Sequence, residues 1–105
     1  MLFPDSNLRT AKRRPALVVQ ADELGTGLPQ TIVAMISSNM ARAGHPSRVV
    51  VQIGEEGAIK SGLLMDSVIM TDNLATIHTS EIDQVIGVFT RRKELDAALR
   101  ATLAL

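Results

Sequence analysis

Residues 12–19 read Lys-Arg-Arg-Pro-Ala-Leu-Val-Val, and this stretch decides how the chain can fold locally. Its apolar second half has the composition of a buried strand. Pro15 can begin that strand because the first residue of a strand can forgo its ladder hydrogen bond. A proline also holds the residue before it in an extended conformation. Arg14 is therefore expected to present its guanidinium at the mouth of the strand, and a guanidinium binds phosphate through two parallel hydrogen bonds.

Further apolar runs rich in β-branched residues, bounded by Gly, Pro or polar residues, also have the length of strands. The predicted strands are residues 16–20, 31–37, 48–53, 66–71 and 84–89, with a shorter candidate at residues 73–77. Long connections separate them at residues 21–30, 38–46 and 54–62. Loops of this length in a small domain often carry function.

The pattern changes to a helical period at residues 91–105. The residues expected on one helical face are Leu95, Ala98, Leu99, Thr102 and Leu103. Thr90 is placed to cap the first turn. Residues 91–93 are all basic, although the helix dipole disfavours cations there by a few tenths of a kcal/mol each, so these charges are expected to serve something else. Short strands followed by one helix predict a mainly β fold, a small and strongly curved barrel.

Length and composition predict one ordinary domain over residues 1–105. The absence of cysteine excludes disulfides, thiolate metal sites and a cysteine nucleophile. No apolar run approaches the roughly 18 residues that cross a bilayer, and the first residues lack the pattern of a signal peptide, so a cytoplasmic protein is expected. With no Trp or Tyr and two Phe, the core must be aliphatic, and dimerisation would add buried surface.

Net charge is zero, so there is no overall attraction to nucleic acid. Basic residues nevertheless cluster at residues 9–14 and 91–93, a pattern that is most often a solvated surface. Residues 25–27 are not followed by the Gly-Lys-Ser/Thr of a phosphate loop. His45 and His78 could each act as a base, although a lone histidine is more often plain polar surface. Neither a cofactor nor a metal is predicted.

Residues 12–19 resemble the second strand of the MazF/PemK toxins, which an Arg-Pro pair anchors. Residues 32–37 resemble the family's third strand, which ends in a hydroxyl residue, and residues 62–69 resemble its Gly-Leu-x-Asp-Ser-Val element. The other matches are the end of the first strand with its loop at residues 2–8, a strand at residues 46–51, a Thr-Ile segment at residues 73–77, and Ile86-Gly87 with the closing helix. The resemblance covers essentially the whole chain.

This resemblance implies an SH3-like barrel that forms a homodimer and cleaves single-stranded RNA at specific sequences without a metal. In that family the ribose 2′-hydroxyl attacks the adjacent phosphate and leaves a 2′,3′-cyclic phosphate. Carried over to this chain, Arg14 is the catalytic arginine and Ser37 its hydroxyl partner. The candidate RNA-binding residues are Lys12, Arg13, Ser38, Arg42, Ser67, Asn73 and Thr76. A cognate antitoxin with an acidic, disordered tail is the expected protein partner.

Three features depart from the family pattern. The opening strand is mostly missing before Leu2, Asn7 stands where many relatives have Asp, and Ala75 replaces a basic residue. A shortened first strand would expose a barrel edge, so weakened activity is one expectation. Two alternatives stay open, namely a toxin of the same fold that inhibits gyrase and a non-catalytic relative that only holds RNA or an antitoxin.

Overall fold

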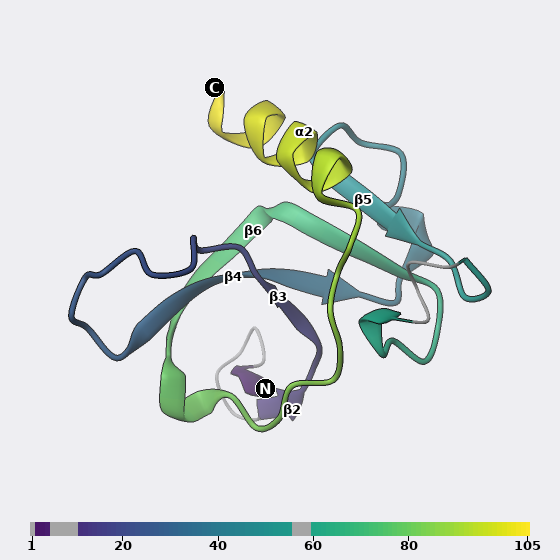
Figure 1. Cartoon of the computed structure of the whole chain (residues 1–105). Coiled ribbons are helices and arrows are strands. Elements are labelled where there is room, and N and C mark those ends of the chain that lie inside the picture. Colours follow the sequence, from purple (N-terminus) through teal and green to yellow (C-terminus); the bar gives the residue numbers. More distant parts are fainter. Residues whose placement is uncertain (1, 5–10, 56–59) are drawn as a thin grey trace.

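The computed structural model describes residues 2–4, 11–55 and 60–105 (Figure 1). Its larger sheet is antiparallel with strand order β3-β4-β6-β5, formed by β3 (Ala16–Val18), β4 (Gln30–Ser37), β5 (Arg48–Val51) and β6 (Ser67–His78). A two-stranded sheet pairs β1 (Leu2–Pro4) with β2 (Ala11–Arg13). The remaining elements are the 3-10 helices η1 (Met40–Arg42) and η2 (Thr79–Glu81) and the helix α2 (Arg92–Leu103).

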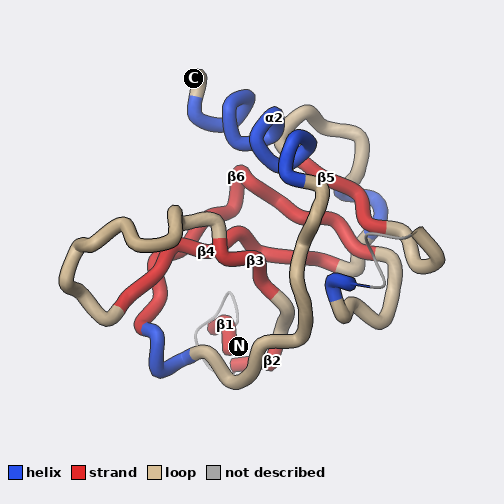
Figure 2. Tube along the Cα trace, in the orientation of Figure 1, coloured by secondary structure: helices blue, strands red, loops and turns tan. Residues whose placement is uncertain are grey.

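The larger sheet curls because its longest strand, β6, bends in the middle. Met35 of β4 pairs with Met70 of β6, but Ala34 pairs with Leu74, so residues 71–73 have no partner on β4. Extra residues on one strand bend it and increase its twist. Figure 2 shows β6 turning at this bend. The result is a half-barrel with one closing helix, which confirms the expected mainly β fold class.

The core lies between α2 and one face of the curled sheet. Its buried cluster consists of Ala34, Ile36, Val49, Val51, Ile69 and Ala98. Thr71, fully buried at the bend of β6, ties this helix to the sheet. Its hydroxyl lies 2.7 Å from the Ser47 carbonyl oxygen, 3.1 Å from the Ala98 carbonyl oxygen and 2.7 Å from the Thr102 hydroxyl. The helix is thereby fixed at the place where β6 leaves β4.

Two predicted strands, residues 66–71 and 73–77, form the single strand β6. The prediction of a strand at residues 84–89 is wrong, since this segment is irregular and exposes Val85 and Val88. It crosses residues 60–62 closely instead of pairing beside a strand. A Cβ atom at Gly87 would overlap the Lys60 carbonyl oxygen, and Val88 N–H donates to that same oxygen.

The helix is confirmed, but its predicted cap is not. Arg91, not Thr90, is the N-cap residue, and no side chain caps the first turn. Leu95 and Ala98 are buried as expected, whereas Leu103 is 51% exposed. At the other end of the chain, β1 supplies a three-residue strand to the N-terminal hairpin. Asn7 lies outside the described residues.

Candidate active site

The register of β3 on β4 runs toward Arg14 on one strand and Ser37 on the other. Ala16 pairs with Met35 and Val18 with Val33, so each step back along β3 is one step forward along β4. The pairing ends at Ala16 and Met35, and the same register continued by two residues would set Arg14 opposite Ser37. Residues directly opposite on antiparallel strands point to the same face, with Cβ atoms about 4.5–5.5 Å apart. On this continued register, the Arg14 guanidinium and the Ser37 hydroxyl would lie on the same face of the sheet.

Both groups can still bind an anion. No ion pair or hydrogen bond joins the half-buried Arg14 side chain to another residue in the described part of the chain. The Ser37 hydroxyl accepts the Asn39 N–H at 3.1 Å, and its own proton can be donated. The Asn39 side chain in turn accepts the Ala41 N–H at 3.1 Å and begins η1. The hydroxyl is thus held by the turn that leads to Arg42.

The face that carries Ser37 is the one opposite the helix. Side chains alternate along a strand, so Met35 and Ser37 point away from the core face of Ala34 and Ile36. The register sets Met70 beside Met35. Two polar side chains contact these thioethers, with Arg42 Nη1 3.8 Å from Met70 Sδ and Asn73 Nδ2 3.0 Å from Met35 Sδ.

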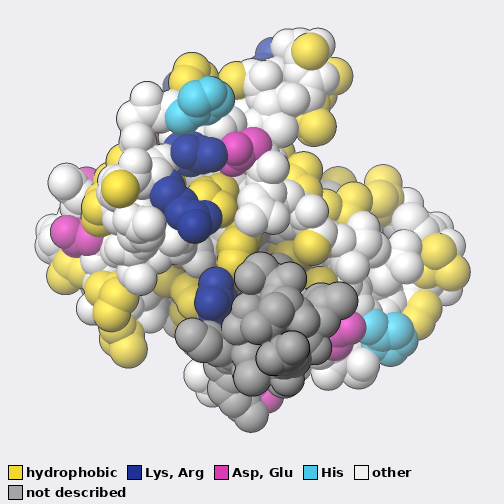
Figure 3. All heavy atoms as spheres, turned by 180° about the vertical axis from the view of Figure 1, so that it is seen from behind, with side chains coloured by type: hydrophobic (Ala, Val, Ile, Leu, Met, Phe, Trp, Pro, Cys, Tyr) yellow, Lys and Arg dark blue, Asp and Glu magenta, His cyan; other side chains and the backbone are white. Residues whose placement is uncertain are grey.

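We call this region, formed by Arg14, Ser37, Met35, Arg42 and Asn73 over the buried side chain of Met70, the arginine face. Figure 3 shows basic side chains following one another down one side of the molecule, with apolar surface between them, to the edge of the grey residues. The combination of unpaired cations and apolar surface suits a ligand that has both phosphates and flat apolar groups.

A third arginine beside this face, Arg48, donates from each of its three guanidinium nitrogens to other parts of the protein. Arg48 donates from Nε and Nη2 to the Asp72 carboxylate at 3.1 and 2.7 Å. Its Nη1 donates to the Arg42 carbonyl oxygen at 2.9 Å. The hydrogen-bonded Arg48 guanidinium lowers the pKa of the Asp72 carboxyl below its ordinary value, and the same contact raises the pKa of Arg48. No local pattern in the sequence predicts this ion pair, because Arg48 and Asp72 are far apart in the chain and lie on different strands.

Several residues expected at the site lie elsewhere. Ser67 is 2% exposed, and its hydroxyl donates to the Met65 carbonyl oxygen at 2.8 Å. Thr76 is exposed but pairs with Ile32, near the opposite end of β4 from Ser37. Ser38 follows Ser37 directly and is exposed. The backbone of Lys12 and Arg13 lies in β2, and their side chains lie outside the described part.

Both histidines are engaged in local turns. Each ring Nδ1 lies 2.7 Å from the hydroxyl of the serine two residues later, His45 with Ser47 and His78 with Ser80. Each also accepts that serine's N–H. Within the described ranges, no three His, Cys, Asp or Glu side chains are grouped as metal ligands. No helix there is long and apolar enough to span a bilayer.

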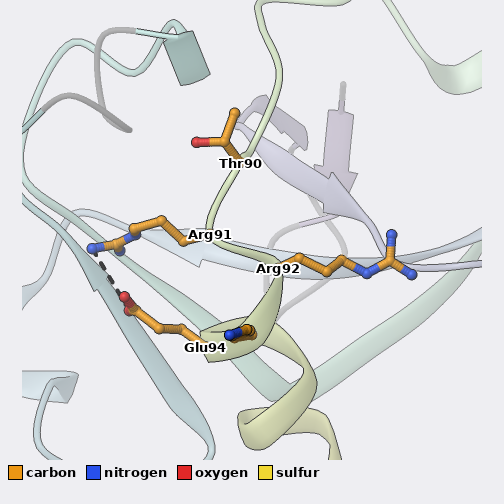
Figure 4. Close-up of a pocket in the computed structure, with 5 residues that line it drawn as sticks. Thr90, Arg91, Arg92 and Glu94 are labelled. Carbon is orange, nitrogen blue, oxygen red and sulfur yellow. Dashed lines mark ion pairs between the residues drawn. The ribbon is translucent and has the colours of Figure 1, made fainter.

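The basic first turn of α2 has a structural use. It lines a surface hollow of about 440 Å³ formed by residues 90–94 (Figure 4). Arg91 Nη1 lies 2.8 Å from Glu55 Oε2 and 3.6 Å from Glu94 Oε2, and its Nη2 donates to the Val50 carbonyl oxygen. Arg92 points away from Arg91 and pairs with Asp96 at 3.4 Å. Arg91 therefore fastens the start of the helix to β5, which accounts for cations where the helix dipole disfavours them.

Comparison with known proteins identifies the family. The model of the PemK-like, MazF-like toxins of type II toxin–antitoxin systems matches residues 1–104. The chain belongs to this family. Its relatives include Endoribonuclease MazF2 of Mycobacterium bovis and Endoribonuclease MazF6 of Mycobacterium tuberculosis, each 33% identical over 107 residues. Each alignment covers 99% of this chain and 90% of the relative. The expected family is confirmed over nearly its full length.

Solved structures of PemK/MazF toxins have the same fold. The Mycobacterium tuberculosis toxin MazF-mt6 superposes with a TM-score of 0.72 at 24% identity, covering 88% of this chain and 87% of that chain. A mycobacterial endoribonuclease in complex with its cognate antitoxin gives a TM-score of 0.72 at 17% identity, covering 99% and 91%. The half-barrel with its C-terminal helix is therefore the fold of these toxins.

Proposed function

We propose that this PemK/MazF-family toxin is an endoribonuclease that cleaves single-stranded RNA on the arginine face, with Arg14 and Ser37 as its catalytic residues. The curated relatives at 33% identity are endoribonucleases, which supports the activity class. The observation that supports the assignment of residues is the register of β3 on β4, which, continued by two residues, would set the unpaired Arg14 opposite Ser37.

In the proposed reaction the ribose 2′-oxygen attacks the adjacent phosphorus and the bond from phosphorus to the 5′-oxygen breaks. The 2′-hydroxyl gives its proton to water, the leaving 5′-oxygen takes up a proton, and the products are a 2′,3′-cyclic phosphate and a 5′-hydroxyl end. Arg14 stabilises the charge that develops on the phosphoryl oxygens. Because a guanidinium stays protonated in water and has no acceptor atom, Arg14 does not act as the general base. Ser37 donates a hydrogen bond that orients the same phosphate.

RNA binding is proposed for the residues around this pair. Arg42 and Asn73 lie over the thioethers of Met70 and Met35, where unpaired bases can be met by hydrogen bonds and by guanidinium stacking. Ser38, Lys12 and Arg13 adjoin the catalytic pair in the chain and are proposed phosphate contacts. Ser67 and Thr76 are assigned no contact, because one is buried and the other lies toward the far end of β4.

Two protein partners are proposed. A cognate antitoxin with an acidic segment would cover the arginine face, since opposite charges favour that contact. A second copy of the chain would cover apolar side chains that are exposed in the described part, among them Leu64 at 93% and Met65 at 57%. Cleavage of cellular RNA would place the activity in the cytoplasm.

The decisive experiment is cleavage of a mixed-sequence single-stranded RNA in excess EDTA by the wild type and by Arg14→Ala. We expect the wild type to leave 2′,3′-cyclic phosphate ends and the variant to lose at least about tenfold in rate, which is about 1.4 kcal/mol of transition-state stabilisation. Arg92→Ala is the matched control, because it removes an arginine on α2. A folded wild type that cuts no RNA would contradict the proposal and make gyrase the next target to test.

A further inference from the structure

We propose that Arg48 is a positioning residue for RNA recognition, which fixes Arg42 and Asn73 relative to one another on the arginine face. This inference rests on the proposed function. Each of the three guanidinium nitrogens of Arg48 donates a hydrogen bond within the protein. Its influence on RNA would pass through the two residues that it holds.

The two residues come from different elements, and Arg48 connects them. Arg42 ends η1, and its carbonyl oxygen accepts from Arg48 Nη1 at 2.9 Å. Asn73 directly follows Asp72, whose carboxylate accepts from Arg48 Nε and Nη2. One planar guanidinium therefore sets the spacing between the backbone of η1 and the backbone of β6. A lysine could not do so, because it lacks the fixed fork of donors.

The bend of β6 makes this connection necessary. Residues 71–73 have no partner on β4, and the ladder between β5 and β6 ends at the pair of Arg48 and Met70. Beyond that pair, the Thr71 N–H donates to the Ser47 carbonyl oxygen at 3.0 Å. Asp72 and Asn73 thus lie where the ladder gives little support, and the contact with Arg48 holds them.

The tips of the two held side chains are bound far more weakly than their backbones. Arg42 Nη1 and Asn73 Nδ2 each face a thioether sulfur, at 3.8 and 3.0 Å, and thioether sulfur is a weak acceptor. RNA oxygens and base edges would compete easily for these donors. A fixed backbone with weakly held donor tips is what a subsite for an unpaired base requires.

The test compares Arg48→Ala and Arg48→Lys with the wild type, using cleavage kinetics and the base preference at the cleavage site. For Arg48→Ala we expect KM to rise about tenfold with kcat nearly unchanged, since a binding contact is lost away from the reacting phosphate, and we expect a weaker base preference. Arg48→Lys should resemble Arg48→Ala. Arg92→Ala, which breaks the ion pair with Asp96 on α2, should behave as wild type. Wild-type KM and base preference in either Arg48 variant would overturn the proposal.

A combined variant separates positioning from a general loss of structure. If Arg48 acts through Arg42 and Asn73, Arg48→Ala should change KM less than about twofold in a background that carries Arg42→Ala and Asn73→Ala, because coupled residues are not additive. Independent, multiplying effects would overturn the proposal. Asp72→Asn, which keeps the side-chain shape, should shift KM in the same direction even if Arg48→Ala fails to fold, and wild-type KM in this variant would count against it. A wild type that neither cuts RNA nor binds an uncleavable 2′-deoxy analogue would defeat the proposed function itself.

Discussion

Arg91, Arg48 and Arg14 carry the same guanidinium in three settings. Arg91 is bound to Glu55, Glu94 and a β5 carbonyl, and its buried Nε has no hydrogen-bond partner. Arg48 is bound to a carboxylate and a carbonyl at the bend of β6. Arg14 has no partner among the described residues. Charge alone would not distinguish these residues, whereas their partners mark Arg14 as the one able to bind a substrate phosphate.

Ser37 should contribute to the rate through its hydroxyl. Ser37→Ala removes one donor to the phosphate, and the loss of one preorganised donor typically costs about 100-fold or more in kcat. Ser37→Thr keeps the hydroxyl and should stay within a few-fold of the wild type. Single-turnover cleavage of one RNA oligonucleotide measures both. Equal loss in the two variants would show that space at this position matters and that the hydroxyl does not.

Asp72 should make stability depend on pH in the acid range. Its pKa in the folded protein lies below the ordinary value of 3.8 because Arg48 donates to its carboxylate. The stabilisation is therefore fully present above pH 3.8 and is lost as the pH falls through the lower, folded value. The effect should be small, since the side chain is 37% exposed and solvent screens the pair. Urea unfolding at pH 7 and pH 3 should show a weaker pH dependence for Asp72→Asn than for the wild type, with Asp96→Asn as control. An identical pH dependence in Asp72→Asn would exclude this role.

The predicted strands are correct where an apolar run has a neighbouring strand with which it can pair. β4 and β5 lie close to the predicted bounds. Residues 84–89 have the same composition but no neighbouring strand to pair with, and composition does not contain that information. The predicted strands at residues 66–71 and 73–77 are separated by Asp72, whereas the structure continues one strand, β6, through a bend at this place.

The contacts within the site also depend on which segments are neighbours, and the sequence does not show this directly. Arg14 and Ser37 could be predicted because a family resemblance names their positions, and the register of β3 on β4 leads toward both residues. The contacts of Arg48 with Asp72, and of Arg42 and Asn73 with two methionines, have no local sequence pattern. They depend on which strands are neighbours and on the register of each pair.

The crossing of residues 84–89 over residues 60–62 should be sensitive to one methyl group. At Gly87 an added Cβ would overlap the backbone of Lys60 and Ser61, so Gly87→Ala should lower the free energy of unfolding by about 1–3 kcal/mol. Gly27→Ala is a suitable control, because its φ of +74° is strained but no atom lies within 4 Å of the added Cβ. Chemical denaturation measures both variants. A loss at Gly87 no larger than that at Gly27 would contradict the close backbone packing.

For the whole molecule, the absence of net charge and the presence of a basic face are compatible. Eleven basic and eleven acidic side chains balance, but arginines at positions 48, 91 and 92 are paired with carboxylates. The unpaired charge of Arg14 is left beside the thioethers and amide of the arginine face. Attraction to RNA should therefore be short-ranged and set by a few contacts rather than by the overall field of the protein.

The salt dependence of the association constant for RNA should report the number of those contacts. For single strands, the logarithm of the association constant falls with the logarithm of salt concentration by about 0.7 for each phosphate neutralised. Contacts from Lys12, Arg13 and Arg14 would give a slope of about −2 with an uncleavable 2′-deoxy oligonucleotide. Arg14→Ala should reduce the slope by about 0.7, whereas Arg92→Ala should leave it unchanged. Arg48→Ala should weaken binding without altering the slope, because Arg48 is already paired with Asp72. A change of slope in Arg48→Ala would mean that this arginine contacts phosphate directly, and an unchanged slope in Arg14→Ala would remove Arg14 from the phosphate site.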